Sequence, residues 1–237
     1  MAIEDHKDLK QVEKAEVTSY FNGTGFERWN RIYSETEEVN KVQKNIRKGH
    51  QKTVDDVLQW INESKPLGEM SFCDAGCGVG SLSLPLALMG AGSIAASDIS
   101  NSMIEETKRR ALLAGVNMSK ITFNTSDLES LEGSFHTVIC LDVFIHYPQK
   151  AAEEMVKHLC GLAKNKLIVS FAPYTPSLAL LKAIGQFFPG PSKTTRAYIL
   201  REKGIVSSAE ECGFTLYRRK LNQAPFYFSQ LIEFRKN

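Results

Sequence analysis

One stretch of the sequence decides the fold: Cys73-Asp74-Ala75-Gly76-Cys77-Gly78-Val79-Gly80. It ends an apolar run at Met70–Ala75 and leads into a helical pattern at Ser81–Met89. Its three glycines allow the backbone to turn sharply and to approach a ligand without a Cβ in the way. The stretch therefore predicts a ligand-binding turn between a strand and a helix, with a plain glycine-rich turn as the alternative.

Outward from this turn, strand and helix patterns alternate. The expected strands are Met70–Ala75, Ser93–Ser97, Ile121–Thr125, His136–Leu141 and Lys166–Phe171, and the expected helices are Ser81–Met89, Ser102–Ala114 and Gln149–Ala163. Such alternation is typical of βαβ units in a parallel sheet that is covered on both faces. After a helical stretch near Ser207–Cys212, two strand-like runs at Thr215–Lys220 and Tyr227–Phe234 predict a hairpin, so one final strand should run antiparallel.

This arrangement resembles the seven-stranded class I methyltransferase fold, a Rossmann-like α/β fold whose parallel sheet ends in an antiparallel hairpin. The resemblance covers Glu69 to Asn237 and implies S-adenosyl-L-methionine as the cofactor, with S-adenosyl-L-homocysteine as its product. A turn signal at Lys65-Pro66-Leu67-Gly68 marks the expected boundary between an N-terminal helical arm or lid at 1–64 and the methyltransferase domain at 65–237. A further lid insertion is expected at about 173–197.

Composition limits the alternatives. The 237 residues are 43% hydrophobic and 24% charged, which is the ordinary balance of a globular protein with a sizeable core. A net charge of only +2 argues against nucleic acid as a partner, and the basic run Arg218-Arg219-Lys220 is interpreted as a solvated face. Cys73-x-x-x-Cys77 lacks a second pair of ligands, so no protein-bound metal is expected. No apolar run is long enough to predict a transmembrane segment.

The predicted cofactor site begins at the glycine turn, with Asp74, Gly76, Cys77 and Gly78. A nicotinamide-binding turn is the rival interpretation, but the third glycine comes one residue early and Ser81 stands in its place. The Asp74 carboxylate would repel a pyrophosphate, whereas it suits a cationic amino-acid end. In the methyltransferase pattern that this turn resembles, the first acid orients the methionine end of the cofactor.

Further cofactor contacts are expected where the next strands end. Asp98, followed by Ile99, ends the second strand, where a carboxylate can accept hydrogen bonds from a ribose diol; capping of the next helix is the alternative. Met103 is expected near the sugar or purine, with core packing as its alternative. Family resemblance places Asp127 and Leu128 at the adenine, although Asp127 also fits a solvated turn. Leu141 ends the fourth strand at the same edge of the sheet.

Three segments are candidates for binding the molecule that accepts the methyl group. The loop Val143-Phe144-Ile145-His146-Tyr147-Pro148 follows the fourth strand, and its histidine could orient a nucleophile, take a proton or simply bind nearby backbone. Aromatic residues and arginines interleave from Tyr20 to Tyr33, which favours either core packing or a lid over a large flat acceptor. The apolar segment between Pro173 and Pro191 suggests a bulky apolar acceptor.

These segments, together with Val42–His50 and the glycine turn, resemble the magnesium-protoporphyrin IX O-methyltransferases of chlorophyll biosynthesis over nearly the whole chain. The resemblance implies methyl transfer to one propionate carboxylate of magnesium protoporphyrin IX. It implies Tyr33 and His146 as the catalytic pair. Arg28, Arg47, His50 and Tyr147 are expected, with that pair, to contact the substrate.

The same resemblance implies a location in the chloroplast stroma or in the cytoplasm of a photosynthetic bacterium, including the surface of photosynthetic membranes. The porphyrin-binding subunit of magnesium chelatase is the partner that it suggests. Three alternatives remain open: a methyltransferase for another apolar acceptor such as a quinone precursor, a cofactor-binding regulator without catalysis, and a dehydrogenase, which Asp74 and Ser81 disfavour.

Overall fold

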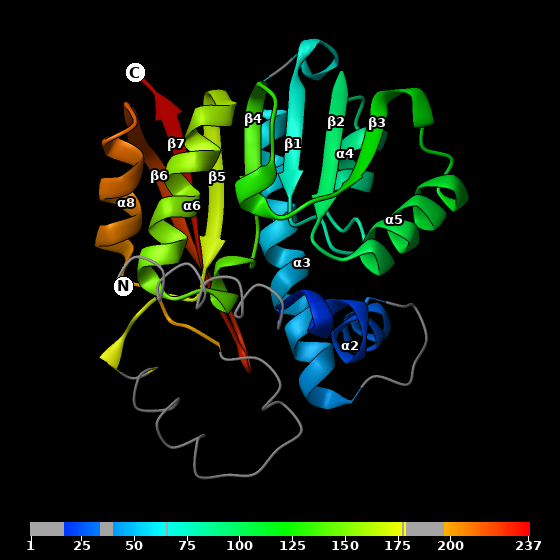
Figure 1. Cartoon of the computed structure of the whole chain (residues 1–237), viewed down its shortest axis with the longest axis horizontal. Coiled ribbons are helices and arrows are strands. Elements are labelled where there is room, and N and C mark those ends of the chain that lie inside the picture. The colour runs from blue at the N-terminus through cyan, green and yellow to red at the C-terminus, as the bar shows by residue number, and fades with distance from the viewer. Residues whose placement is uncertain (1–16, 34–39, 65, 177, 179–196) are drawn as a thin grey trace, which may run out of the picture.

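The computed structural model describes residues 17–33, 40–64, 66–176, 178 and 197–237. These residues form a seven-stranded sheet in the order β3-β2-β1-β4-β5-β7-β6, with helices on both faces (Figure 1). Strands β1 to β5 pair in parallel, whereas β7 runs antiparallel to both β5 and β6. The predicted α/β sheet with an antiparallel C-terminal hairpin is therefore confirmed.

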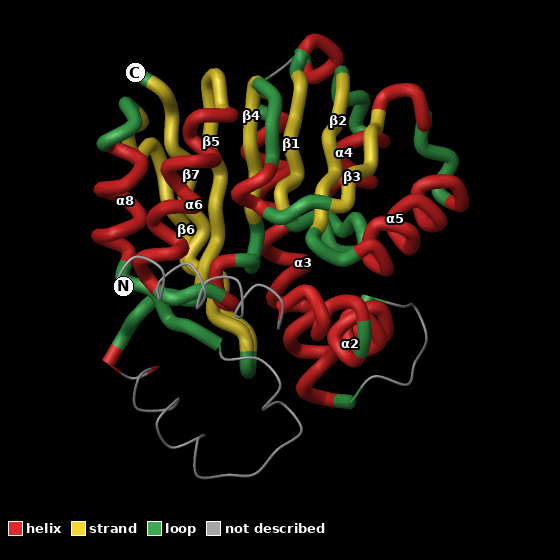
Figure 2. The backbone as a smooth tube through the Cα atoms, in the orientation of Figure 1, coloured by secondary structure: helices red, strands yellow, loops and turns green. Residues whose placement is uncertain are grey.

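The bounds of the elements follow the sequence patterns closely (Figure 2). The strands are β1 (Ser71–Ala75), β2 (Ser93–Asp98), β3 (Ile121–Thr125), β4 (Phe135–Cys140), β5 (Ala163–Phe171), β6 (Phe214–Ala224) and β7 (Tyr227–Lys236). The helices are α2 (Thr24–Ile32), α3 (Lys41–Asn62), α4 (Ser83–Leu88), α5 (Asn101–Leu113), α6 (Gln149–Leu162) and α8 (Glu202–Glu210), with short 3₁₀ turns η1 (Leu67–Glu69), η2 (Met118–Lys120), η3 (Leu128–Ser130) and η4 (Phe144–His146). Strand β6 is longer than predicted because its pairing with β7 continues to the hairpin turn.

Two helices begin at side-chain caps that the sequence supplies. The Asn40 side chain accepts the backbone N–H of Gln43, and the Gln43 side chain accepts that of Asn40, which forms a capping box at the start of α3. At α5, the Ser100 hydroxyl accepts the N–H of Met103. Ser100 is thus the cap, which leaves the neighbouring Asp98 carboxylate available for other partners.

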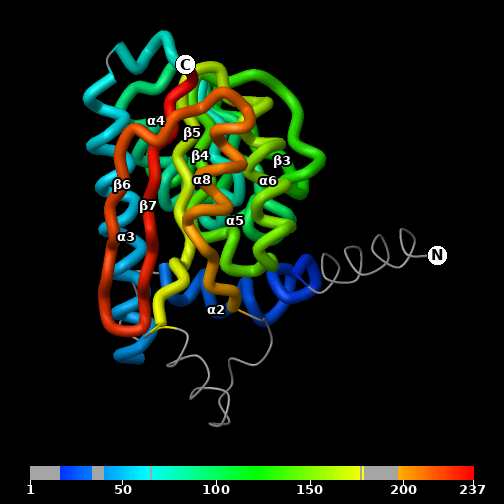
Figure 3. The backbone as a smooth tube through the Cα atoms, turned by 90° about the vertical axis from the view of Figure 1, so that its left-hand side faces the viewer, coloured from blue at the N-terminus to red at the C-terminus, as the bar shows by residue number. Residues whose placement is uncertain are grey.

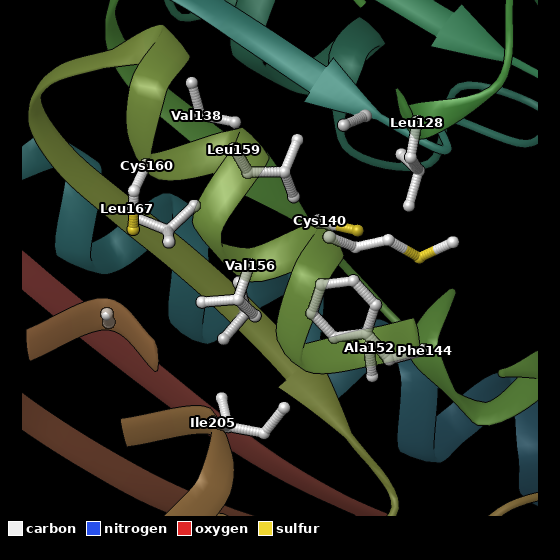
Figure 4. Close-up of a cluster of buried hydrophobic side chains, with 14 of the residues drawn as sticks. Leu128, Val138, Cys140, Phe144, Ala152, Val156, Leu159, Cys160, Leu167 and Ile205 are labelled. Carbon is white, nitrogen blue, oxygen red and sulfur yellow. The ribbon is translucent and has the colours of Figure 1, made fainter. Parts of the chain in front are cut away.

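The hydrophobic core has two parts, one on each face of the sheet. One part packs α6 and α8 against the sheet, and Figure 4 shows Val138 of β4, Leu159 of α6, Leu167 of β5 and Ile205 of α8 within it. The other part packs α3, α4 and α5 against the opposite face, where Ile168 of β5 points. Because neighbouring residues of a strand face opposite sides, each buried strand supplies both parts.

Helix α3 lies beside the β6–β7 hairpin (Figure 3). The guanidinium of Arg218 on β6 stacks over Trp60 of α3, 4.4 Å from the ring centroid, and pairs with the fully buried Glu233 of β7 at 2.7 Å. Arg219 and Lys220 pair with Glu202 and Asp56. The interpretation of this basic run as a solvated face is therefore wrong for Arg218, because ion pairs and an aromatic ring bury most of its side chain.

The division of the chain at residue 64 stays a prediction. Within the proposed arm, α3 packs against the sheet at β6 and β7, whereas α2 lies beyond the carboxyl ends of the parallel strands (Figure 1). Strand order reverses between β1 and β4, and open α/β sheets bind ligands at this point, next to the carboxyl ends of the strands. In the described part of the chain, no helix combines the length and apolarity needed to span a bilayer.

Candidate functional site

The glycine turn after β1 can adopt its shape only with glycines. Gly76, Gly78 and Gly80 all have positive φ, at 87°, 53° and 85°. The N–H groups of Gly76 and Cys77 donate to the carbonyl of Ser97, at 2.8 and 2.9 Å, which ties the turn to β2. A Cβ on Gly76 would lie 2.2 Å from the Val143 side chain, whereas a Cβ on Gly78 would meet nothing within 4 Å. The turn therefore leaves open space beside Gly78.

The Asp98 carboxylate at the end of β2 faces this turn. One oxygen accepts the N–H of Gly78 and the other that of Ser100, each at 2.9 Å. Burial raises the pKa of Asp98, and the two backbone donors oppose that shift. An ionised carboxylate offers about four lone-pair sites, so about two remain for a ligand that presents a pair of hydroxyl groups.

A pocket opens between this turn and α2, with about 830 Å³ of empty space that is partly open to solvent. Of the predicted cofactor residues, those that line it are Gly76, Cys77, Gly78, Asp98, Ile99, Met103, Leu128 and Leu141. Of the predicted substrate residues, those that line it are Tyr33, His50, His146 and Tyr147.

Four predicted site residues lie outside the described lining of the pocket. Asp74 is 2% exposed and its carboxylate accepts the Ser83 hydroxyl at the start of α4; burial, opposed by that hydrogen bond, raises its pKa to about 6. The Asp127 carboxylate accepts the N–H of Ser130 and so caps η3. The structure also places Arg28 and Arg47 outside the lining. Direct ligand contacts by these four residues stay predictions.

Tyr33 and His146 border the pocket from different elements. The Tyr33 ring stacks on Trp29 at a centroid distance of 5.8 Å and meets the His50 ring edge-on at 5.1 Å. Burial raises the pKa of Tyr33 well above its usual value, and the Asp142 carboxylate adds to the shift. The His146 ring meets Phe21 edge-on at 5.0 Å. Burial lowers the pKa of His146 to about 4, against the opposing effect of Asp142, so its imidazole is neutral at pH 7.

Sequence reasoning did not assign a role to Asp142, which follows β4 and lines the pocket. It has a positive φ of 57°, and its side chain accepts hydrogen bonds from the hydroxyls of Ser170 (2.7 Å), Tyr227 (2.7 Å) and Ser229 (2.8 Å) and binds Nδ1 of His50 (2.9 Å). Although burial alone would raise its pKa, the hydrogen bonds and the charge of His50 lower it to about 2. A signal for Asp142 was present, since it directly follows the expected strand His136–Leu141, whose carboxyl end lies at the same edge of the sheet as Asp98.

The segment of residues 17–33, hereafter the α2 segment, is fixed to α5 at two points. The Ser100 hydroxyl lies 2.8 Å from the carbonyl of Phe21 and 2.9 Å from the side-chain oxygen of Asn22. Arg110 donates to the carbonyl of Tyr33 at 3.1 Å and to the Asn30 side chain at 2.7 Å. These contacts hold the aromatic residues of the segment over the pocket.

Comparison with known proteins identifies the family. A family described as magnesium-protoporphyrin IX methyltransferase C-terminus matches residues 140–236, and a methyltransferase domain family matches residues 72–166. The chain is 50% identical to the chloroplastic magnesium protoporphyrin IX methyltransferase of Arabidopsis thaliana. The matched region covers 93% of this chain and 70% of the relative. It is also 49% identical to the magnesium-protoporphyrin O-methyltransferase of a Synechocystis strain, and the matched region covers 93% of this chain and 95% of that relative. The chain belongs to the magnesium protoporphyrin IX methyltransferase family.

A solved structure of this family supports the same conclusion. The magnesium protoporphyrin IX methyltransferase of Synechocystis with bound S-adenosylhomocysteine superposes with a TM-score of 0.87 at 46% identity, covering 94% of this chain and all of that one. In the protein described here, the segment that matches the family's C-terminal model supplies Asp142 and His146 to the pocket. Tyr33 and His50 come from residues that precede both matched segments.

Proposed function

We propose that this protein transfers a methyl group from S-adenosyl-L-methionine to a propionate carboxylate of magnesium protoporphyrin IX, which gives the monomethyl ester in chlorophyll biosynthesis. The observation that carries the proposal is one pocket with two differently built walls. The glycine turn and Asp98 form one wall, and Phe21, Trp29 and Tyr33 of the α2 segment contribute to the other. The names of the relatives supply the acceptor, and a solved structure of the Synechocystis relative contains bound S-adenosylmethionine.

The first wall fits the cofactor. The Asp98 carboxylate keeps acceptor capacity for a ribose diol, and the open space beside Gly78 lets a ligand approach the backbone. Met103 is 2% exposed and lines the same wall, where it can pack against the sugar or purine. When bound, S-adenosyl-L-methionine supplies a methyl group on a positively charged sulfur.

The second wall must position the acceptor more than it must activate it. A carboxylic acid has a pKa of about 4, so a propionate is already ionised at neutral pH and needs no strong base. Transfer is an in-line displacement on the methyl carbon, and holding the reacting atoms about 3 Å apart and in line can supply roughly 7–11 kcal/mol. The aromatic residues of the α2 segment exclude water, which favours a reaction that neutralises charge.

Tyr33 and His146 are proposed to orient the propionate by hydrogen bonds. Because the pKa of Tyr33 is raised well above its usual value, its hydroxyl keeps its proton and can donate. His146 Nδ1 is buried and has no hydrogen-bond partner among the described residues, so it can bind a ligand group. In Tyr33→Phe and His146→Ala, kcat should fall while the Kd of S-adenosylhomocysteine stays unchanged; an unchanged kcat in both would exclude this role.

The partner and the location are proposed on family grounds. The relative of 50% identity is named as chloroplastic, which supports the chloroplast stroma as the location, with the cytoplasm of a photosynthetic bacterium as the alternative. Peripheral binding to photosynthetic membranes and transfer of substrate from magnesium chelatase are further proposals. The proposed lid at 173–197 lies mostly outside the described residues, which there include only 173–176, 178 and 197.

One assay tests the proposal directly. The protein is incubated with methyl-labelled S-adenosylmethionine and, in parallel, with magnesium protoporphyrin IX, the metal-free porphyrin and a quinone precursor, and the products are weighed by mass spectrometry. We expect one labelled methyl group on magnesium protoporphyrin IX. If the porphyrin mass is unchanged and the quinone precursor is methylated, the quinone precursor is the acceptor instead. If the protein binds the cofactor but forms no product, it is a regulator without catalysis.

A further inference from the structure

The pocket has an unusual charge composition for a site that takes an anionic substrate. Among the described residues that line it, none is a lysine or an arginine, although two are aspartates, Asp98 and Asp142. A propionate carboxylate that enters this space meets negative charge at short range and loses hydration. The positively charged sulfur of the cofactor offsets part of this repulsion, and His50 and His146 are the lining residues that could supply a further cation.

The two histidines differ in their partners. His146 carries no charge at neutral pH, because burial holds its pKa at about 4. His50 instead lies 2.9 Å, through Nδ1, from the Asp142 carboxylate. Among the described residues, the hydrogen bond of the His50 ring is made by Nδ1, and none engages Nε2. A histidine whose Nδ1–H donates to a carboxylate can hold a second proton on Nε2, and that N–H is a charge-assisted donor.

The surroundings of Asp142 keep this pair in place. Hydroxyl groups from β5 and β7 bind its carboxylate, so its position does not depend on His50 alone. Helix α3 approaches β7 closely at Gly49, where a Cβ would lie 2.3 Å from the Tyr227 ring. The Tyr227 hydroxyl binds both Asp142 and Thr53 of α3. Residue 50 is thereby held where α3 meets the end of β4.

We propose that His50 is the cation that binds the substrate's propionate carboxylate, and that Asp142 is the positioning residue that holds its imidazolium toward the pocket. Nδ1–H of His50 donates to Asp142, and Nε2–H donates to a propionate oxygen. The edge of the Tyr33 ring limits rotation of the imidazole. This inference rests on the proposed function, since it assigns one residue pair to the recognition of that carboxylate.

Binding experiments separate this charge role from a structural one. The Kd values of magnesium protoporphyrin IX and of its dimethyl ester, which lacks both carboxylates, are measured by porphyrin fluorescence in the presence of S-adenosylhomocysteine. In His50→Gln, the diacid should bind about 10- to 100-fold more weakly, and the diester should bind as in the wild type. Asp142→Asn should show the same selective loss. Two matched controls, Asp55→Asn on the exposed side of α3 and His158→Gln on α6, should change neither Kd.

The possible outcomes either support or overturn the proposal. A selective loss for the diacid in His50→Gln supports it, whereas an equal loss for diacid and diester, or no loss for either, would overturn it. These outcomes differ from those expected if the proposed function is wrong. If the proposed function is wrong, the wild type itself would neither bind nor methylate the porphyrin.

Discussion

Arg110→Ala should loosen the α2 segment without disturbing the sheet. Arg110 on α5 donates to the Tyr33 carbonyl and to the Asn30 side chain, and it also pairs with Glu106. Glu106 keeps a partner in the variant, because Arg109 binds both of its oxygens at 2.7 and 2.8 Å. The substitution therefore removes the two contacts to the α2 segment and leaves no unpaired carboxylate behind.

The expected magnitude follows from these two hydrogen bonds. A hydrogen bond to a charged group contributes about 1.5–3 kcal/mol, and the Arg110 side chain is 21% exposed, which favours the lower end of that range. Because the two bonds share one side chain, they are not fully additive, and about 2–3 kcal/mol is expected for the pair. Opening of the α2 segment should then be favoured by roughly 30- to 150-fold.

Hydrogen exchange measured by mass spectrometry reads this opening directly. The amides of Thr24–Ile32 should exchange faster by about the factor of 30 to 150 derived above, because local exchange reports the local opening equilibrium. The amides of α3 around Val57 should be unchanged. In steady-state assays, kcat/KM for the porphyrin should fall, because Tyr33 is less often in place over the pocket.

Arg109→Ala is the matched control. Arg109 lies next to Arg110 and pairs with the same Glu106, but its side chain is 59% exposed and, among the described residues, makes no hydrogen bond to the α2 segment. It should leave both exchange and turnover near the wild-type values. The reasoning would be refuted if α2 exchanged at the wild-type rate in Arg110→Ala, or if both variants accelerated its exchange equally.

Three further predictions concern the turn, the loop histidine and the buried ion cluster. Gly76→Ala should weaken cofactor binding, because residue 76 has a φ of 87° and its new Cβ would collide with Val143; calorimetry with S-adenosylhomocysteine checks this, and wild-type affinity would contradict it. The pKa of His146 is depressed to about 4 in the folded state, so its contribution to stability is fully present above the unfolded pKa of about 6.5 and is lost as the pH falls toward 4. Between pH 7 and pH 5, Tm should therefore fall more in the wild type than in His146→Phe, and parallel Tm curves would count against a buried neutral imidazole. Glu233→Gln removes the fully buried carboxylate that pairs with Arg218 and Arg235, and urea denaturation should show a loss of about 3–5 kcal/mol in the free energy of unfolding; a loss below about 1 kcal/mol would show that the cluster is solvated.

Much of the fold could be predicted from local patterns. The strands and helices from β1 to β5 lie within a few residues of their expected bounds, because buried parallel strands form short apolar runs and each is followed by a turn signal. The wall of the pocket formed by the glycine turn and Asp98 could be predicted for a related reason. Gly76 directly follows β1 and Asp98 ends β2, and the carboxyl ends of parallel strands meet at one edge of the sheet.

Local patterns could not predict how distant segments combine. Asp142 was visible as the residue after a strand, but its partners His50 and Tyr227 are 92 and 85 residues away in the chain. Arg28 and Arg47 illustrate the opposite case, since their charge suggested a place in the site and the structure puts them outside the pocket lining. Sequence patterns fix the face of an element on which a side chain lies, whereas the packing of elements decides which faces meet.

The sequence by itself determined the class of this protein. The glycine turn, Asp98 and the alternation of strands and helices depend on local backbone geometry, which is encoded within a few neighbouring residues. Only the tertiary structure decided which charged and neutral groups line the pocket. It set His50 against Asp142, buried His146 and left the described part of the pocket lining without lysine or arginine, because these properties arise from side chains that are brought together by the packing of α2, α3 and β7.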